Sequence, residues 1–163
     1  VHTLDTAVIA HCLGLLRNRR FGGSCDVNRL VLLALYHDCS EILTGDMPTP
    51  IKYYNPEIND AYKKVEAVAN EKLVSMLPED LRGDYRPLLG HENEDPELLR
   101  LLKAADKLSA LVKCIEEENA GNREFSKAKQ STLRAIEEMR LPEADAFVAE
   151  FLPSYGLTVD ELN

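Results

Sequence analysis

A chain of 163 residues, 45% of them hydrophobic, is long enough to bury the core of one domain. Its formal net charge of −9 argues against a broad surface for a nucleic-acid polymer or an anionic membrane, because both partners are themselves negatively charged. No uninterrupted run of about 18 apolar residues occurs, so the sequence predicts no membrane-spanning helix.

The first half of the chain is predicted to be helical, with one proline-framed loop. Apolar residues at 4, 8, 12, 15 and 16 share one face of a helix over residues 3–19, which ends before the glycine pair at 22–23. Asp26 is the expected N-cap of a leucine-rich helix over 27–43. The two prolines of "DMPTP" then predict a loop over 44–55.

The second half continues the helical pattern. Pro56 suits the first position of a helix over 56–77, followed by a short helical turn over 79–85 and a loop through His91. Asp95 and Pro96 form a cap and first-turn pair that opens a long helix over 96–119, with Gly121 just past its end. Two more helices are expected at 124–140 and 142–152. With no alternating strand pattern, the sequence predicts one all-α domain over residues 1–163, with about six to seven helices.

Four cysteines stand at positions 12, 25, 39 and 114, and no two of them form a CxxC pair. Scattered thiols with mostly apolar neighbours are typical of reduced core residues in a cytosolic protein. We therefore expect free thiols and a cytoplasmic location.

The stretch "LYHDCSEILTGDMPTP" over residues 35–50 places ionisable groups beside leucine, isoleucine and methionine. Burying such groups is costly unless something compensates them, and a metal ion bound by His37 and Asp38 would do so. His2 and Asp106, on an earlier and a later predicted helix, are the candidates for the remaining ligands. Two imidazoles and two carboxylates suit Mn²⁺, Co²⁺, Fe²⁺ or Ni²⁺; Zn²⁺ also accepts them, whereas Mg²⁺ is less suited to imidazole.

Each candidate also has a structural interpretation. A lone histidine beside a core, such as His2, is more often a hydrogen-bonded structural residue, and Asp106 lies only at the fringe of an apolar helix face. His11 and His91 have no acidic or histidine neighbours at ligand spacing, so we expect structural or surface roles for them. Glu41 shares the helical side of the His37-Asp38 pair, where it is either a proton acceptor or a solvated helix-end residue.

Together these segments resemble the HD-domain metal-dependent phosphohydrolase superfamily, and specifically its bacterial 5′-deoxynucleotidase branch. The superfamily signature H…HD…D matches His2, His37-Asp38 and Asp106. The branch resemblance covers nearly the whole chain, through "HTLDTAVIAH", "RNRRFGG", "LLALYHDCSEILTGDMPTPIKYYN", "EKLVSMLPEDLR", "ADKLSALVKCIEE" and "AGNREF".

The resemblance implies an HD-domain helical fold around a metal site. It implies a homodimeric enzyme that hydrolyses deoxyribonucleoside 5′-monophosphates, which are small-molecule substrates, to the deoxynucleoside and phosphate. The ligands it implies for one divalent ion are His2, His37, Asp38 and Asp106. It also implies that Glu41 and Asp46 are the acidic pair at the reaction centre.

For the reaction itself we expect water to attack phosphorus in line, opposite the 5′ oxygen. Glu41 would position or deprotonate that water, and Asp46 would orient water or protonate the leaving oxygen. Thr49 and Lys52, in the "PTPIK" stretch, are candidate contacts to the phosphate or the sugar. The structural alternative for these two is a rigid loop with a surface lysine.

Two alternatives stay open. One is another HD phosphohydrolase, acting on a cyclic nucleotide or a (p)ppGpp-like alarmone, against which the "GDMPTP" loop argues. The other is a non-catalytic helical binding or dimerisation module, against which the retained ligand types argue. The family also carries an N-terminal segment with an Arg-Trp pair, and a glutamate where Val1 stands. We expect that this segment is missing from the chain.

Overall fold

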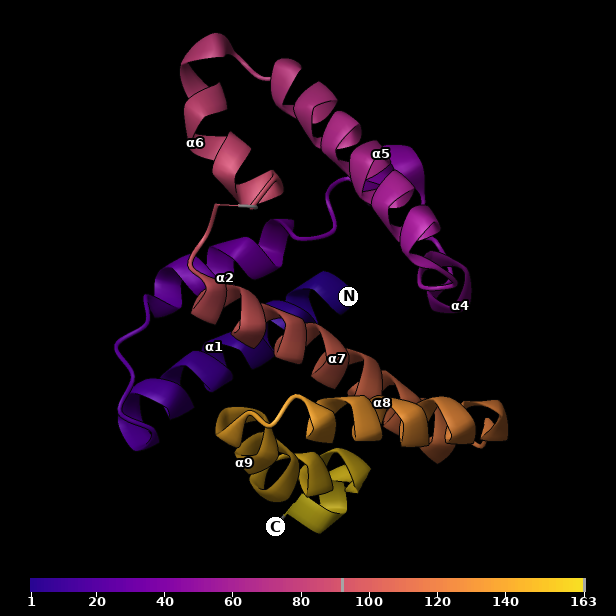
Figure 1. Ribbon diagram of the computed structural model, residues 1–163. Coiled ribbons are helices and arrows are strands. Elements are labelled where there is room, and N and C mark those ends of the chain that lie inside the picture. Colours follow the sequence, from indigo (N-terminus) through magenta and orange to yellow (C-terminus); the bar gives the residue numbers. More distant parts are fainter. Residues whose placement is uncertain (92, 163) are drawn as a thin grey trace. The chain divides into compact units, whose positions relative to one another are not determined.

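The computed structural model describes residues 1–91 and 93–162, which form helices, turns and connecting segments (Figure 1). No strand occurs in this described part, so the all-α prediction is confirmed. Among the same residues, no helix combines the length and apolarity that crossing a membrane requires. The chain divides into two compact units, Val1–Ala34 with Asp95–Asn163, and Leu35–Glu94. The single domain over 1–163 stays a prediction.

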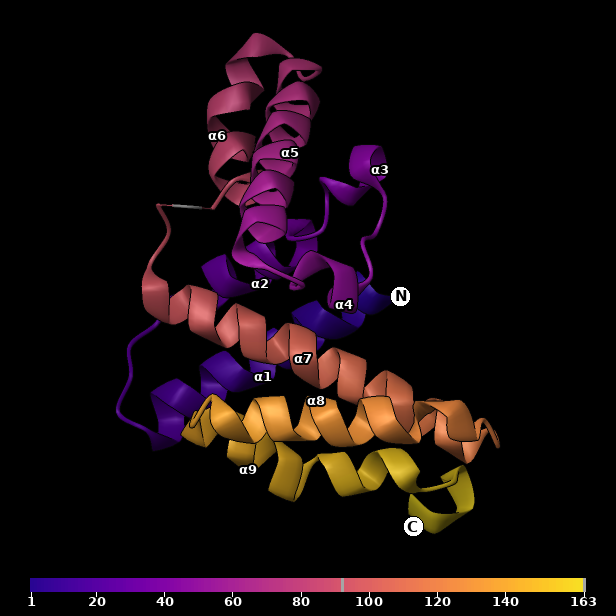
Figure 2. The same cartoon turned by 45° about the vertical axis from the view of Figure 1, so that its right-hand side comes forward.

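The larger unit is organised around the 24-residue helix α7 (Pro96–Asn119). Helices α1 (His2–Arg20), α8 (Ser126–Glu138) and α9 (Pro142–Glu150) all pack against it, and α8 also contacts α9. Figure 2 shows α7, α8 and α9 following one below another. Three short 3-10 turns complete this unit, at Arg123–Phe125, Leu152–Gly156 and Val159–Leu162.

Leucine side chains fill the interior of this unit. Helix α2 (Val27–Tyr36) packs closely on α1 at Gly14. A Cβ atom at this position would lie only 3.1 Å from Val27 Cγ2, so the absence of a side chain permits the close approach. Each fully buried leucine stabilises the fold by about 1.5–3 kcal/mol relative to an exposed one. The fully buried residues of this interior include Leu13, Leu30, Leu33, Leu101, Leu108, Leu111 and Ile136.

Asp26 and Asp95 cap the N-termini of α2 and α7, as the sequence predicts. The backbone N–H of Arg29 donates to Asp26 Oδ1 at 3.0 Å, and that of Glu97 donates to Asp95 Oδ1 at 2.9 Å. After α7, Gly121 takes a φ of 91°, a left-handed conformation that favours glycine.

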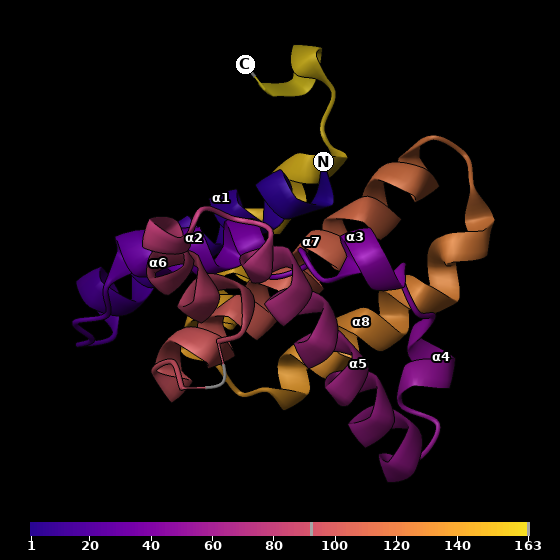
Figure 3. The same cartoon turned by 90° about the horizontal axis from the view of Figure 1, so that it is seen from above.

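The smaller unit contains a helical hairpin of α5 (Pro56–Ser75) and α6 (Glu79–Leu89). Two one-turn helices, α3 (Glu41–Thr44) and α4 (Thr49–Lys52), pack against α5 (Figure 3). The Tyr36 and Tyr85 rings meet edge to face, with their centroids 5.7 Å apart. The sequence did not predict α3 or α4 as separate helices.

The helix expected over 27–43 is interrupted, so that prediction was wrong. It ends at Tyr36, and residues 37–40 form a turn before α3. In this turn the N–H of Glu41 donates to Asp38 O at 3.0 Å, and that of Ile42 donates to Cys39 O at 3.1 Å. These bonds span three residues instead of four, which tightens the backbone. Short polar side chains at 38 and 40 favour such turns over a continuous helix.

Two further boundaries were also wrong. The region predicted as a loop over 44–55 contains α4, because Pro48 and Pro50 suit the start of a helix as well as a loop. Helix α6 does not stop near 85 but continues past Pro87 to Leu89. The proline removes one backbone donor, while Leu88 and Leu89 beyond it are buried and keep the last turn in place.

All four cysteines are free thiols, as expected. Only Cys114 is buried, whereas Cys12, Cys25 and Cys39 are half-buried, so the expectation of core positions holds for one of them. Burial raises the pKa of each of these thiols.

Candidate active site

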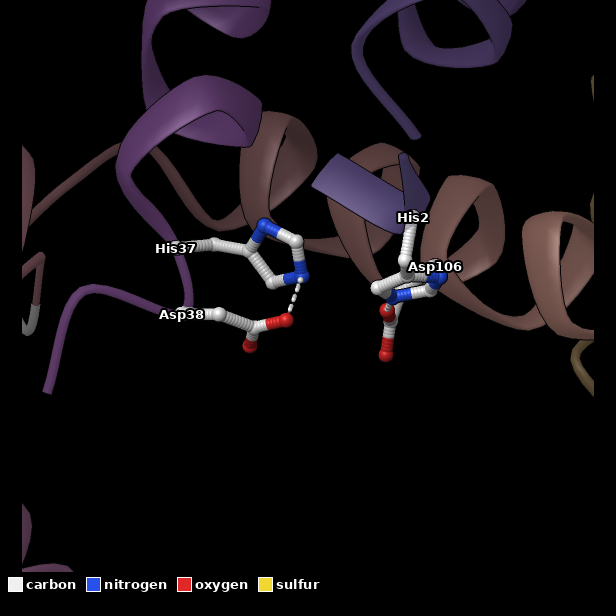
Figure 4. Close-up of side chains that lie close together, drawn as sticks. All are labelled: His2, His37, Asp38 and Asp106. Atoms are coloured by element: carbon white, nitrogen blue, oxygen red, sulfur yellow. Dashed lines mark hydrogen bonds and ion pairs between the residues drawn. The ribbon is translucent and has the colours of Figure 1, made fainter. Parts of the chain in front are cut away.

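His2 and Asp106 form a close pair in the larger unit. His2 begins α1, Asp106 lies near the middle of α7, and the two helices pack together. Nε2 of His2 lies 2.7 Å from Asp106 Oδ1 (Figure 4). The packing of α1 against α7 therefore brings together two residues that the sequence analysis grouped as ligand candidates.

The second ring nitrogen of His2 also has a partner. Nδ1 lies 3.0 Å from the hydroxyl oxygen of Ser109, which is only 3% exposed. The Thr6 hydroxyl donates to the backbone oxygen of His2 at 2.8 Å. Sequence reasoning missed Ser109; its signal is the three-residue spacing from Asp106, which places both on one side of a helix.

His37 and Asp38 form a second pair, in the turn between α2 and α3. Nε2 of His37 lies 3.1 Å from Asp38 Oδ2 (Figure 4). Adjacent residues in a regular helix project about 100° apart, which separates their side chains. The turn at 37–40 removes this restriction, and the two side chains point toward each other.

Each pair offers one imidazole nitrogen and one carboxylate as potential metal ligands. Borderline divalent ions accept two imidazole nitrogens and two carboxylates as ligands, so the donor atoms present fit such an ion. Each pair lies within one of the two units. That a single ion is bound by all four side chains stays a prediction.

Glu41 and Asp46 lie close behind the second pair in sequence. Glu41 is the first residue of α3, and Asp46 lies in the segment between α3 and α4. Burial raises the pKa of the Glu41 carboxyl above its ordinary value, and the charges of Asp38 and Asp46 raise it further, against a smaller opposing effect of Lys52 and His37. A raised pKa is typical of carboxylates that accept a proton in catalysis.

Thr49 and Lys52 are the first and last residues of α4, so neither is in a loop. Nζ of Lys52 lies 3.6 Å from Glu66 Oε1 and 4.7 Å from the centre of the Tyr62 ring. Burial alone would lower the pKa of Lys52, but Glu66 and the tyrosines outweigh it and raise that pKa. Lys52 is therefore a cation anchored to α5 and not a loose surface side chain.

The other two histidines lie outside both pairs. His11 is exposed on α1. His91 follows α6, and burial lowers its pKa below the ordinary value. These positions agree with the structural or surface roles expected for them.

Comparison with known proteins places the chain in a family. Residues 1–155 match the family model described as 5′-deoxynucleotidase YfbR-like. The chain belongs to this family. A 5′-deoxynucleotidase of Vibrio vulnificus and one of Yersinia pestis are each 47% identical to it over 99% of its length, and the match spans 84% and 82% of those proteins.

Solved structures agree with the family. An HD-domain phosphohydrolase from Listeria innocua, 28% identical, matches with a TM-score of 0.81 over 94% of this chain and 74% of that one. A protein from Pyrococcus horikoshii, 25% identical, matches with a TM-score of 0.66 over 95% of this chain and 80% of that one. The predicted superfamily, the deoxynucleotidase branch and the HD-domain fold are thereby confirmed. The YfbR-like family is also one of enzymes, which favours a hydrolase over a non-catalytic helical module.

Proposed function

We propose that this chain is a divalent-metal-dependent 5′-deoxynucleotidase, which releases phosphate from deoxyribonucleoside 5′-monophosphates. The observation that carries the proposal is the family match over residues 1–155. It is supported by the two His–Asp pairs and by the acidic residues that follow the second pair. The printed names of the Vibrio and Yersinia relatives describe the same activity.

The proposed ligands of one ion are His2, His37, Asp38 and Asp106. Their donor types fit Co²⁺, Mn²⁺, Fe²⁺ or Ni²⁺, and Zn²⁺ accepts them as well. When bound, such an ion supplies positive charge beside the phosphate and acidifies water.

The remaining chemistry falls to acidic and polar side chains. Glu41 positions the attacking water and takes its proton, a role that suits a carboxyl group with a raised pKa. Asp46 orients water or protonates the 5′ oxygen as its bond to phosphorus breaks. Lys52, held in its charged form, attracts the phosphate, and the Thr49 hydroxyl donates a hydrogen bond to the phosphate or the sugar.

The test is phosphate release from dAMP and AMP, measured in parallel after metal removal with EDTA and after addition of Co²⁺ or Mn²⁺. We expect metal-dependent release from dAMP well above that from AMP. Equal release from both would support the metal site but overturn the preference for the deoxy sugar. No release with any ion would overturn the proposal, and a panel with cyclic AMP and ppGpp would then test the other HD substrates.

We also propose that the enzyme is a cytoplasmic homodimer, as the family resemblance implies. Light scattering after size-exclusion chromatography tests the oligomeric state. A dimer has twice the chain mass of 18.3 kDa, and a single species at that chain mass at micromolar concentration would overturn the dimer.

A further inference from the structure

The ring of His2 is held at both nitrogens by side chains of one helix. Nε2 lies 2.7 Å from Asp106 Oδ1, and Nδ1 lies 3.0 Å from Ser109 Oγ. Asp106 and Ser109 are three residues apart on α7, about one helical turn. The ring plane and direction of His2 are therefore set by two contacts on a packed helix.

The position of Ser109 is unusual for a hydroxyl group. Ser109 is 3% exposed, and its neighbours along α7 include the fully buried Ala105 and Leu108 and the buried Val112. A hydroxyl group removed from water is costly unless it makes a hydrogen bond. His2 Nδ1 provides that partner.

The two contacts determine where the imidazole carries its proton. A neutral imidazole has one N–H donor and one lone pair, and an ionised carboxylate only accepts. In a neutral ring without metal, an Nε2–H that donates to Asp106 leaves Nδ1 to accept from the Ser109 hydroxyl. A histidine that binds metal through Nε2 needs the opposite tautomer, with the proton on Nδ1. A hydroxyl serves both states, because rotation about its C–O bond turns it from donor into acceptor.

We propose that Ser109 is a positioning residue for the metal-binding tautomer of His2. When metal binds, the Nε2 proton leaves to solvent, Nδ1 takes up a proton from solvent, and the Ser109 hydroxyl accepts a hydrogen bond from Nδ1–H, which leaves the Nε2 lone pair free for the metal. This inference rests on the proposed role of His2 as a ligand. Without the hydroxyl, the partly buried Nδ1–H of the metal-binding tautomer loses its acceptor on α7, and this loss is felt in the bound state alone. Loss of the hydrogen-bond partner of a ligating histidine typically weakens metal affinity by about 10–100-fold.

The experiment compares Ser109→Thr with Ser109→Val in the full chain. These two variants have the same branched shape and differ in the hydroxyl, so their difference isolates the hydrogen bond. The affinity for Zn²⁺ alone is measured by calorimetry after EDTA treatment. We expect Thr to bind close to wild type and Val to bind about 10–100-fold more weakly. Ser131→Ala, which removes an exposed hydroxyl on α8, should leave the affinity unchanged.

A second readout follows the tautomer directly. Nitrogen-15 NMR of labelled histidines, assigned with a His2→Gln variant, should place the His2 proton on Nε2 without metal and on Nδ1 with Zn²⁺. A proton on Nδ1 in both states would overturn the exchange. If the branched side chains disturb folding, as judged by circular dichroism, Ser109→Ala and Ser109→Cys replace them.

The outcomes separate this inference from the proposed function. Equal Zn²⁺ affinity for the Val and Thr variants would overturn the role of Ser109 and leave the metal site intact. A wild-type chain that binds neither Zn²⁺, Co²⁺ nor Mn²⁺ would overturn the metal site, and the role of Ser109 with it.

Discussion

Nε2 of His2 lies 2.7 Å from Asp106 Oδ1, although 104 residues separate the two in sequence. Neither residue is held by a loop: one begins α1 and the other lies within α7. The packing of these helices around buried residues such as Leu13 and Leu108 fixes their relative position. The pair is thus preorganised by the core, which is the arrangement that a metal site requires.

The first prediction concerns a ligand of the second pair. Asp38→Ala should abolish metal binding and phosphate release, because it removes one charged metal ligand. The chain should remain helical, because no buried apolar contact is lost. Bound metal is measured by elemental analysis, and helix content by circular dichroism. Asp60→Ala, at an exposed aspartate of α5, is the matched control and should retain both metal and activity. Unchanged metal content and turnover in Asp38→Ala would refute the site.

The second prediction separates metal binding from proton transfer. Glu41→Gln keeps the size of the side chain but removes the proton acceptor, so kcat should fall by about 10²–10⁴-fold while metal content stays at the wild-type level. The control is Glu57→Gln, at an exposed glutamate in the first turn of α5. If Glu41→Gln loses the metal as well, Glu41 acts as a ligand and the assigned role is wrong.

Much of the fold could be predicted because its signals are local. The caps at Asp26 and Asp95 begin helices through hydrogen bonds within one turn, and the apolar period of residues 96–119 is long enough to be unambiguous. The turn at 37–40 could not be predicted, because the leucine-rich run before it and Ile42 and Leu43 after it keep a helical pattern. Hydrophobic period alone does not show where the backbone tightens.

The same contrast holds at the site. His37 and Asp38 are adjacent, so the sequence identifies them as a pair without further information. His2 and Asp106 were candidates for the remaining ligands because they stand on an earlier and a later predicted helix, and the family resemblance supplied the specific assignment. No local signal relates two residues on different helices. Ser109 was missed for a similar reason: its spacing places it on the same side of α7 as Asp106, but this spacing alone does not reveal a partner on α1.

The third prediction tests Lys52 as a contact to the phosphate. Lys52→Met keeps the aliphatic part of the side chain near Tyr62 and removes the charge. A hydrogen bond to a charged group contributes about 1.5–3 kcal/mol, so KM for dAMP should rise by about 10–100-fold. Lys63→Met, at an exposed lysine of α5, should leave KM unchanged. An unchanged KM together with a lower melting temperature in Lys52→Met would show that Lys52 serves α4–α5 packing through Glu66 instead.

The last prediction concerns a buried ion pair that joins α1 to α9. Nη1 of Arg17 donates to Glu143 Oε1 at 3.1 Å, and the Glu143 side chain is 1% exposed. Arg17→Met leaves this buried carboxylate without its cation, so it should lower the free energy of unfolding by about 3–5 kcal/mol. For a chain of this size, that corresponds to a fall in melting temperature of roughly 6–20 °C.

A double variant and a surface control make this prediction specific. Arg17→Met combined with Glu143→Leu should recover most of the lost stability, because an apolar pair of similar volume avoids the desolvation of a lone charge. Arg20→Met, which breaks the exposed pair with Glu150 on the same two helices, should change stability by no more than about 1 kcal/mol. Urea unfolding followed by circular dichroism measures all three. Equal losses for Arg17→Met and Arg20→Met would mean that burial of Glu143 does not determine the strength of this pair.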